Sequence, residues 1–395
     1  MSKKLTEIEN LKFLQFIKDI NTCSRCSYCR DTYNENDNTY MICPIRENTA
    51  GFESFIAKGK LMILQGIIEG ILEITPRVAE IFFTCTTCNN CSTHCPSDIN
   101  TVKIFESFRE DLQDLEFGYP VHVALADYTT KQKNPYNEPN ENRLDWIPNN
   151  EKTYIDKKSK LGYFVGCTSS YRSKEISKAF YSILDKSGVD FTILSDEYCC
   201  GSPLIRTGHP EIAEECAKHT IDKMSELGIE EIVFTCAGCL RTFEMDHKKI
   251  RNKIKTLSYL KLLERLIDKE IIRFRKNDPI KVTYHDPCHT TKGVSNPDFK
   301  TPRNILRKIP GIELIEMKSN KKGSICCGAG GGVKSVFPDL AVKIASKRIE
   351  EALETNARYL LSSCPFCRRN LHDAAKNMNA PIKVMDIVEL LDERI

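Results

Sequence analysis

Two pairs of adjacent cysteines constrain this chain more than any other feature. They are Cys199 and Cys200 in DEYCCGSPL, and Cys326 and Cys327 in GSICCGAGGG. Neighbouring cysteines do not easily form a disulfide with each other, because the bridge needs Cβ vectors that face each other at a suitable Cα separation. A chain of 395 residues with 19 cysteines also differs from the small secreted proteins that disulfides stabilise. We therefore expect the doublets to bind metal.

Each doublet belongs to an internal repeat. The two cysteine sets are Cys167, Cys199, Cys200, Cys236 and Cys239 in the first copy, and Cys288, Cys326, Cys327, Cys364 and Cys367 in the second. In the first copy the strand-like runs LGYFVGC, VDFTIL and EIVFTCAGC alternate with helical patterns, and KVTYHDPC, GIELIEM and RYLLSSCPFC do so in the second. This alternation predicts two α/β modules with parallel sheets. In such sheets functional groups gather beyond the carboxyl ends of the strands, where these cysteines fall.

A different cysteine motif lies near the N-terminus. The segment CTTCNNCSTHCP matches the C-x2-C-x2-C-x3-C-P run of bacterial ferredoxins, and CSRCSYCR is similar except that its fourth cysteine is delayed to Cys43. In two-cluster ferredoxins the fourth cysteine of each run serves the other cluster, so we expect two cubane [4Fe-4S] clusters. Their expected ligands are Cys23, Cys26, Cys29 and Cys95 for one, and Cys85, Cys88, Cys91 and Cys43 for the other. Structural zinc is the alternative, and two three-cysteine runs, each completed by Cys-Pro, disfavour it.

Composition and pattern predict an α+β multidomain protein. We expect an α-helical two-cluster ferredoxin domain at 1–115, a linker at 116–158, a first α/β module at 159–255, a connector at 256–279 and a second module at 280–395. The first twenty residues predict an amphipathic helix and not a signal peptide, and the interrupted apolar stretch 61–74 predicts a packed helix. We therefore expect a cytoplasmic protein with no membrane span of its own. The near balance of 57 basic and 54 acidic residues argues against nucleic-acid binding.

The motifs resemble the CCG domains of heterodisulfide reductase and related iron-sulfur oxidoreductases. The whole layout is similar to the D subunits of CoB-CoM heterodisulfide reductase, and stretches such as CCGAGGGVKSVFPDLA and VMDIVELL carry that likeness. The resemblance implies that each five-cysteine set holds a non-cubane [4Fe-4S] cluster. The iron-sulfur subunits of glycerol-3-phosphate, glycolate and lactate dehydrogenases share the layout, so the resemblance fixes architecture better than substrate.

Several residues beside these motifs are further candidates for function. Glycines allow the backbone to pass close to a cluster or substrate, and the candidates are Gly328, Gly330, Gly331 and Gly332. His285 and His289 flank Cys288 and are candidate proton donors for a nascent thiolate, or they only order the loop. Four arginines follow cysteine motifs and would hold sulfonate or phosphate groups of a substrate, or offset cluster charge; they are Arg172, Arg206, Arg241 and Arg368. Cys216 lies on the apolar face of a predicted helix, where we expect it to be a core residue.

The resemblance implies a protein that takes part in methanogenesis. It would pass electrons from the two cubanes to the non-cubane clusters, which would reduce the disulfide CoM-S-S-CoB to two thiols between the modules. The alternative is an electron relay of a flavin-dependent 2-hydroxy-acid or glycerol-3-phosphate dehydrogenase. Either function requires an electron-donor partner, such as a b-type cytochrome, a ferredoxin-linked protein or a flavoprotein. Such a partner would also be the route by which the chain reaches a membrane surface.

Overall fold

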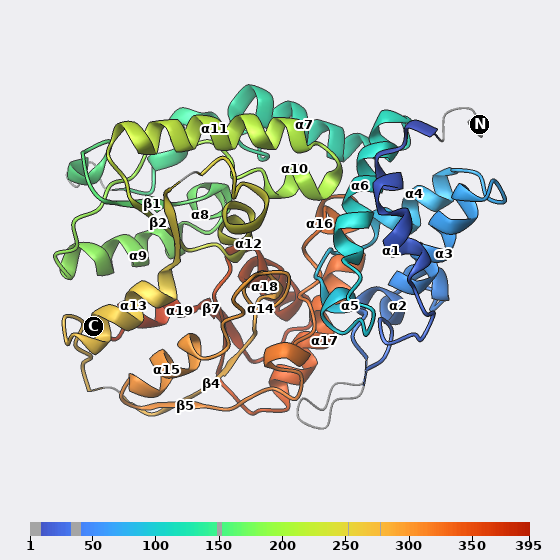
Figure 1. Cartoon of the computed structure of the whole chain (residues 1–395). Helices are drawn as coiled ribbons and strands as arrows, with labels where there is room; N and C mark the ends of the chain where they lie inside the picture. Colours follow the sequence, from blue (N-terminus) through green and yellow to red (C-terminus); the bar gives the residue numbers. More distant parts are fainter. Residues whose placement is uncertain (1–8, 33–40, 148–151, 252, 277) are drawn as a thin grey trace.

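The chain folds into a helical lobe and two modules that each contain a parallel sheet. The computed structural model describes residues 9–32, 41–147, 152–251, 253–276 and 278–395 (Figure 1). The lobe lies on the right of Figure 1, the first module at the upper left and the second module below it. The expected order of a helix-rich N-terminal part followed by parallel α/β structure is therefore confirmed.

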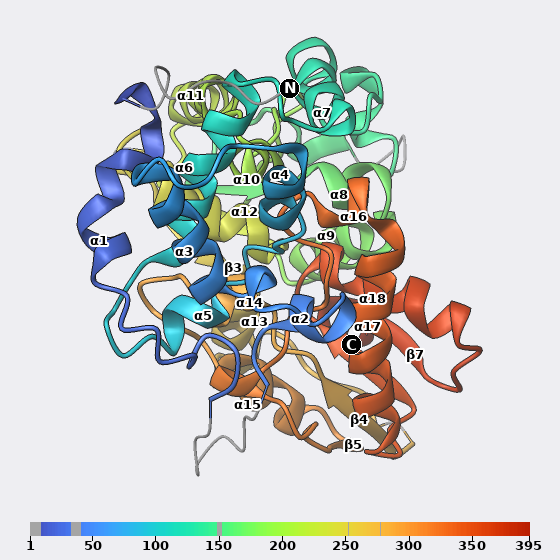
Figure 2. The ribbon, with the colours of Figure 1, turned by 90° about the vertical axis from the view of Figure 1, so that its right-hand side faces the viewer.

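The lobe consists of helical segments (Figure 2), and their apolar side chains share one core. Its helical segments are η2 (Lys12–Phe16), α1 (Ile17–Asn21), α2 (Pro44–Asn48), η3 (Glu53–Phe55), α3 (Ala57–Ile68), α4 (Pro76–Phe83), α5 (Asn90–Thr93) and α6 (Thr101–Asp114). The ring of Phe82 packs edge to face against Phe105 and Phe108, with centroids 5.5 and 4.6 Å away. The stretch predicted as a packed helix forms α3. The expected N-terminal amphipathic helix lies partly outside the described residues, and its described part forms η2 and α1.

Most of the expected linker has regular structure. It contains α7 (Pro120–Gln132) and the short 3-10 segments η4 (Asn140–Leu144) and η5 (Lys152–Tyr154). Helix α7 begins at a proline, which suits the first turn of a helix because no intrahelical N–H is needed there. The helix packs against α10 and α11 of the first module and α16 of the second. Arg143 and Trp146, further along this stretch, are buried. The segment therefore fixes the lobe to both modules instead of separating them.

The first module has a parallel sheet in the order β1-β2-β3. Its strands are β1 (Leu161–Phe164), β2 (Glu231–Phe234) and β3 (Lys255–Ser258), and its helical segments are α8 (Cys167–Tyr171), α9 (Lys174–Lys186), α10 (Ser202–Thr207), α11 (Pro210–Glu226), α12 (Ala237–Arg241) and the π-helical η6 (Thr242–Asp246). The predicted strand at 189–194 pairs only through isolated bridges, of Thr192 with Gly162 and of Ile193 with Ile155. Strand β3 instead lies at the boundary with the expected connector.

The second module has the strand order β5-β4-β6-β7, again all parallel. Its strands are β4 (Ile280–Tyr284), β5 (Ile312–Leu314), β6 (Tyr359–Ser362) and β7 (Lys383–Asp386), and its helical segments are α14 (Cys288–Thr291), α15 (Thr301–Lys308), η7 (Lys321–Gly323), α16 (Val333–Val336), α17 (Pro338–Leu353), α18 (Pro365–Asn377) and α19 (Ile387–Asp392). Helices α11 and α17 bury the apolar residues that the sequence places three or four apart, such as Ile221 and Ile344. The repeat in sequence is therefore a repeat in structure.

Each module ends in a strand and a helix that packs on the other module. Helix α13 (Tyr259–Asp268) follows β3 and packs against α15, whereas α19 follows β7 and packs against α9. A buried hydrogen bond joins the two segments, because the Tyr259 hydroxyl donates to a carboxylate oxygen of Asp386 at 2.5 Å. One apolar core runs through both modules. The stretch expected as a connector is thus the closing unit of the first repeat.

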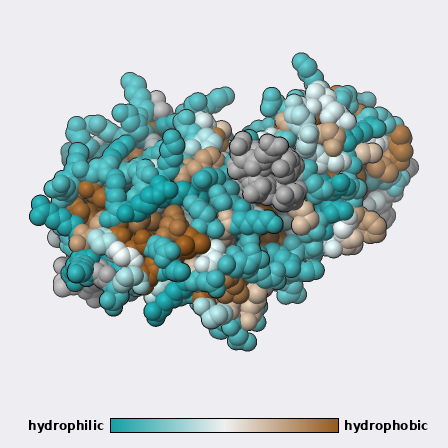
Figure 3. All heavy atoms as spheres, turned by 90° about the horizontal axis from the view of Figure 1, so that it is seen from below, coloured by the Kyte–Doolittle hydropathy of each residue, from teal (hydrophilic) through white to brown (hydrophobic). Residues whose placement is uncertain are grey.

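In the part of the chain that the structure describes, no helix is long and apolar enough to cross a membrane. On the face shown in Figure 3, apolar side chains gather in separate patches between hydrophilic ones.

Candidate metal centres

The ten cysteines of the two repeats converge on one cavity. It has a volume of about 570 Å³ and lies between the modules, with every repeat cysteine in its lining. The sheets explain part of this convergence, because six of the ten cysteines follow the carboxyl ends of β1, β2, β4 and β6, whereas the two doublets lie in the loops before α10 and α16. Cys236 and Cys364 are the N-cap residues of α12 and α18, where the positive end of a helix favours a thiolate over a thiol.

Within each module the sulfur atoms form a continuous series of contacts. The side chains in hydrogen-bonding contact are Cys167 with Cys199, Cys199 with Cys200, Cys200 with Cys239 and Cys239 with Cys236 in the first module, and Cys288 with Cys326, Cys326 with Cys327, Cys327 with Cys367 and Cys367 with Cys364 in the second. The two series meet, because Cys236 also contacts Cys364. The structure therefore brings both predicted five-cysteine sets together and joins them at one point.

Hydrogen bonds make some of these thiols acidic. A hydrogen bond with Cys199, and then one with Cys239, lowers the pKa of Cys200 to about 6. Contacts with neighbouring thiols also lower the pKa of Cys327 and of Cys364 well below the ordinary cysteine value. Thiolates are the form of cysteine that binds metal. Each module thus contains at least one cysteine that is disposed to bind iron as a thiolate.

The cysteines of the lobe gather in a second region. Cys43, Cys85, Cys88 and Cys91 line one small cavity together with Cys29 of the other expected set. Cys43 is close enough to Cys85 to be affected by its charge, so the delayed fourth cysteine lies beside the run that we expected it to complete. Of the other expected set, Cys26 is exposed, whereas Cys23, Cys29 and Cys95 are partly buried. The set that contains Cys26 therefore lies nearest to solvent.

A contact between two cysteines links the lobe to the second module. The thiol of Cys88, in the loop between α4 and α5, contacts that of Cys326 in the second doublet.

Buried lysines accompany the cysteines of the lobe and those of the second module. Lys292 lies close to Cys88, Cys288 and Cys326 and donates to the carbonyl of Ser324, and burial lowers its pKa.

Lys60 is the corresponding cation of the lobe cavity. It donates to the carbonyl of Phe55, lies close to Cys43, Cys85 and Cys91, and is 1% exposed. In the first module the guanidinium of Arg143 lies 3.5 Å from the sulfur of Cys167. Positive charges beside thiolates stabilise them and offset the negative charge of a bound cluster.

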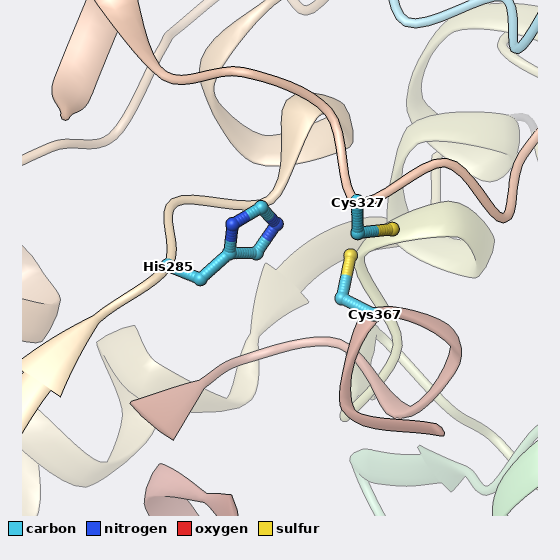
Figure 4. A group of neighbouring side chains, drawn as sticks. All are labelled: His285, Cys327 and Cys367. Carbon is cyan, nitrogen blue, oxygen red and sulfur yellow. The ribbon is translucent and has the colours of Figure 1, made fainter. Parts of the chain in front are cut away.

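The two candidate histidines differ in position. His289 lines the cavity and lies against Gly238 of the first module, whereas His285 is absent from the cavity lining. The His285 ring points at the sulfurs of Cys327 and Cys367, and the three ligand atoms lie within 4.8 Å of one another (Figure 4). Burial lowers the pKa of His285 to about 3 and that of His289 to about 4. Whether either histidine donates a proton or only orders the loop stays a prediction.

Both ring nitrogens of His285 are buried and have no hydrogen-bond partner among the described residues. An unpartnered buried nitrogen is costly, so a group is expected to fill this place. A cluster held by Cys327 and Cys367 would present sulfur atoms to the His285 N–H. The soft thiolate ligands of both modules also fit iron-sulfur chemistry better than hard cations.

The four candidate glycines serve contacts between parts of the chain. Gly331 has φ +63°, and a Cβ there would lie 2.4 Å from the carbonyl oxygen of Cys85. Gly330 and Gly332 similarly approach Thr86 and His122. These three glycines also line the cavity, but Gly328 packs against α17 and does not. The glycine run lets the second doublet lie directly against the cysteine loop of the lobe.

The four candidate arginines are already paired with carboxylates. Their partners are Glu138 for Arg172 at 2.7 Å, Glu106 and Asp246 for Arg206 at 3.1 and 2.5 Å, Asp246 for Arg241 at 3.2 Å, and Glu389 for Arg368 at 2.6 Å. Of the four, only Arg206 lines the cavity. They are therefore poorly suited to bind an anionic substrate. Arg369, which follows Arg368 and carries no motif of its own, lines the cavity instead.

Arg109 is a second residue that the sequence did not reveal. Its guanidinium is fully buried and donates to the carbonyls of Phe82 and Cys85 in the lobe, to that of Arg206 in the first module at 2.5 Å and to that of Gly331 in the second at 2.9 Å. One side chain thus holds all three parts of the molecule at the cavity. An arginine within an amphipathic helix gives no sequence signal for such a role.

Cys216 is buried on α11, as expected of a core residue. It lies near enough to Cys167 and Cys199 for their charges to interact, and burial raises its pKa to about 12. It takes no part in the series of sulfur contacts described above, and a raised pKa favours the thiol.

Comparison with known proteins agrees with this arrangement. The cysteine-rich domain named CCG matches residues 161–244 and 282–372, and the 4Fe-4S dicluster domain matches residues 19–99. The chain is 38% identical to the D subunit of dihydromethanophenazine:CoB--CoM heterodisulfide reductase from Methanosarcina barkeri, over 84% of this chain and 83% of that protein. It is 39% identical to the protein of the same name in Methanosarcina acetivorans, over 79% and 77%. A more distant relative is the EtfAB:quinone oxidoreductase of Syntrophomonas wolfei, 26% identical over 79% of this chain and 46% of that protein.

A dicluster lobe followed by two modules with converging five-cysteine sets defines an iron-sulfur oxidoreductase of the CCG type. The chain belongs to the family of heterodisulfide reductase D subunits, because its likeness to those proteins extends over most of both chains.

Proposed function

We propose that this chain is the subunit that reduces a disulfide, CoM-S-S-CoB, to two thiols in the cavity between its two modules. The observation that carries this proposal is the convergence of both five-cysteine sets on one cavity. Its volume of about 570 Å³, which includes the space that bound clusters would take, lies in the range typical of small-molecule sites. The reaction consumes two electrons and two protons for each disulfide.

The cysteine sets support four [4Fe-4S] clusters. We assign cubanes to Cys23, Cys26, Cys29 and Cys95 and to Cys43, Cys85, Cys88 and Cys91, and a non-cubane cluster to each repeat set. When bound, these clusters supply electrons and, in the modules, iron to which sulfur can bind. Contacts between cysteines of different sets support an order of the clusters. Cys88 contacts Cys326 and Cys236 contacts Cys364, so the order runs from the lobe to the second module and then to the first.

Electrons would enter at the lobe from a partner protein. Cys26 is exposed, and the loop that carries it lies along α3, because Arg25 donates to Gln65 at 3.0 Å. Tyr28 and Met62 expose apolar surface in the same region. A protein donor would dock there, and the relatives named as subunits of a reductase support a complex of this kind.

The relay alternative is supported by the likeness to an EtfAB:quinone oxidoreductase. A relay needs clusters close to one another but no cavity between them. The shared cavity therefore favours the disulfide reductase, and the two functions are separated by whether thiols are released.

The test uses the full chain, purified and reconstituted without oxygen. It should contain about 16 irons and, with a low-potential dye as the only reductant, should release two thiols for each CoM-S-S-CoB. Cys326→Ala should abolish thiol release while the lobe still accepts electrons from the dye. Cys200→Ser should lose about four irons and Cys216→Ser none, which makes the latter a matched control. Fully loaded protein that is reduced by the dye but releases no thiol would instead support the relay.

A further inference from the structure

The two modules carry an arginine at the same place in their motifs, and the two arginines have different surroundings. Arg241 lies two residues after Cys239, and Arg369 lies two residues after Cys367. Arg241 is 7% exposed and paired with Asp246 at 3.2 Å. Arg369 is partly buried and lines the cavity, and among the described residues no hydrogen bond or ion pair to its guanidinium is present. The charge of Arg241 is thus neutralised by a carboxylate, whereas the guanidinium of Arg369 is free to bind a ligand in the cavity.

The charge around Arg369 is not compensated by its neighbours. Lys334 and Asp373 also line this part of the cavity, but they pair with each other at 2.7 Å, and Lys334 donates to Asn370 as well. The nearby hydroxyl of Tyr136 hydrogen-bonds with Thr168 at 2.9 Å. Among the described residues, Arg369 is therefore the cation of the lining that has no carboxylate partner, whereas Arg206 and Lys334 each have one.

Arg369 belongs to a part of the cavity lining that is not fully buried. Its side chain and that of Phe366 are partly buried, and Ser335 and Pro338 of the same lining are exposed. The residue equivalent to Phe366 in the first module is Gly238, against which His289 lies. The lining thus contains a cation and an apolar ring that are both within reach of solvent.

We propose that Arg369 binds the anionic group of the disulfide substrate, a sulfonate or phosphate, and thereby fixes which half of the disulfide lies beside α18. A guanidinium binds either oxyanion through two parallel hydrogen bonds, which gives direction as well as affinity. This inference rests on the proposed function, because it names the residue that selects the substrate of the same site. Arg369 is a binding residue and takes no part in electron transfer.

The experiment compares three symmetrical disulfides, whose chains end in sulfonate, in phosphate or in an uncharged hydroxyl. In Arg369→Gln, kcat/KM for the sulfonate-ended and phosphate-ended disulfides should fall about tenfold or more through a higher KM, because a charge-assisted pair is lost. The hydroxyl-ended disulfide should change less than about twofold. Arg369→Lys should recover part of the loss. The larger loss identifies the anion that the site prefers, and a loss on either anion supports the site.

The matched control is Lys376→Gln, which removes the same charge from the exposed face of α18 and should leave all three disulfides unaffected. Iron content is measured for every variant, so that a protein that has lost its clusters is not mistaken for one that binds the disulfide weakly. Equal losses on charged and uncharged disulfides, or no loss on either anion, would overturn the role of Arg369.

Equilibrium binding of the sulfonate-ended disulfide to oxidised protein separates this inference from the proposed function. Weaker binding by Arg369→Gln, with or without turnover by the wild type, supports the anion site. Binding without thiol release contradicts the proposed reaction alone. No binding by the wild type would overturn both.

Discussion

At the scale of single residues, the spacing of cysteines predicted which side chains the structure brings together. Six cysteines of the two five-residue sets follow strand ends, and the doublets reach the same cavity from loops. Arginines were harder to place. Arg368 and Arg369 are adjacent, and successive residues of a helix point about 100° apart, so sequence alone does not say which one faces the cavity. Arg368, the candidate that the sequence offered, binds Glu389, whereas Arg369, which was not a candidate, lines the cavity.

His285 gives a prediction about the second module. The corresponding residue of the first module is Phe164, so the repeat itself supplies the substitution His285→Phe. Loss of the N–H beside Cys327 and Cys367 should make the midpoint potential of the second non-cubane cluster more negative, because hydrogen bonds to cluster sulfurs stabilise the reduced form. A redox titration followed by electron paramagnetic resonance measures this shift.

The comparison for this variant is His372→Phe, which changes an exposed histidine on the same helix as Cys367. The potential of the second cluster should be unchanged there, and the signals of the other clusters should be unchanged in both variants. An unaltered second cluster in His285→Phe would mean that the imidazole has no electrostatic role.

At the scale of elements, the sequence indicated the repeat but not its ends. Strand β3 is only Lys255–Ser258, and its single buried residue gives no alternating pattern to detect. Its membership in the first sheet depends on pairing with β2, a contact between distant parts of the chain. The exchange of α13 and α19 between modules was equally hidden, since an amphipathic helix does not show which surface will cover its apolar face.

Asp386, the N-cap of α19, should make the stability of this exchanged packing depend on pH. Its carboxyl accepts from Tyr259 and from the backbone of Val388, and burial raises its pKa to about 8. An unfolded aspartate ionises near pH 4, so between about pH 4 and 8 the folded chain binds more protons, and stability falls as pH rises. Asp386→Asn keeps a capping oxygen and should reduce this loss. Anaerobic urea unfolding, followed by circular dichroism at several pH values, measures it.

Asp339→Asn is the control for this measurement, because it changes an aspartate at the surface in the first turn of α17. That variant should keep the wild-type dependence on pH. The same slope in Asp386→Asn as in the wild type would show that another group controls stability over this range.

At the scale of the whole molecule, one guanidinium holds the three parts together. Arg109→Met should destabilise the protein by about 3–5 kcal/mol, because it leaves buried carbonyls of the lobe and of both modules without their donor. The urea midpoint of the reconstituted protein measures this change. Arg265→Met, which removes an exposed arginine from α13, should stay within about 0.5 kcal/mol of the wild type. Equal effects of the two substitutions would contradict the central place of Arg109.

The contacts between cysteines also have a consequence for how the repeat is inherited. The lobe reaches the second module through Cys88 and Cys326, and the first module is reached from there across Cys236 and Cys364. Under the proposed function, two copies arranged one behind the other provide no spare for the first, because damage to the second copy would also cut the first off from the lobe. A lineage that loses the second cysteine set would then lose the use of both, whereas loss of the first set would leave the second still reached from the lobe.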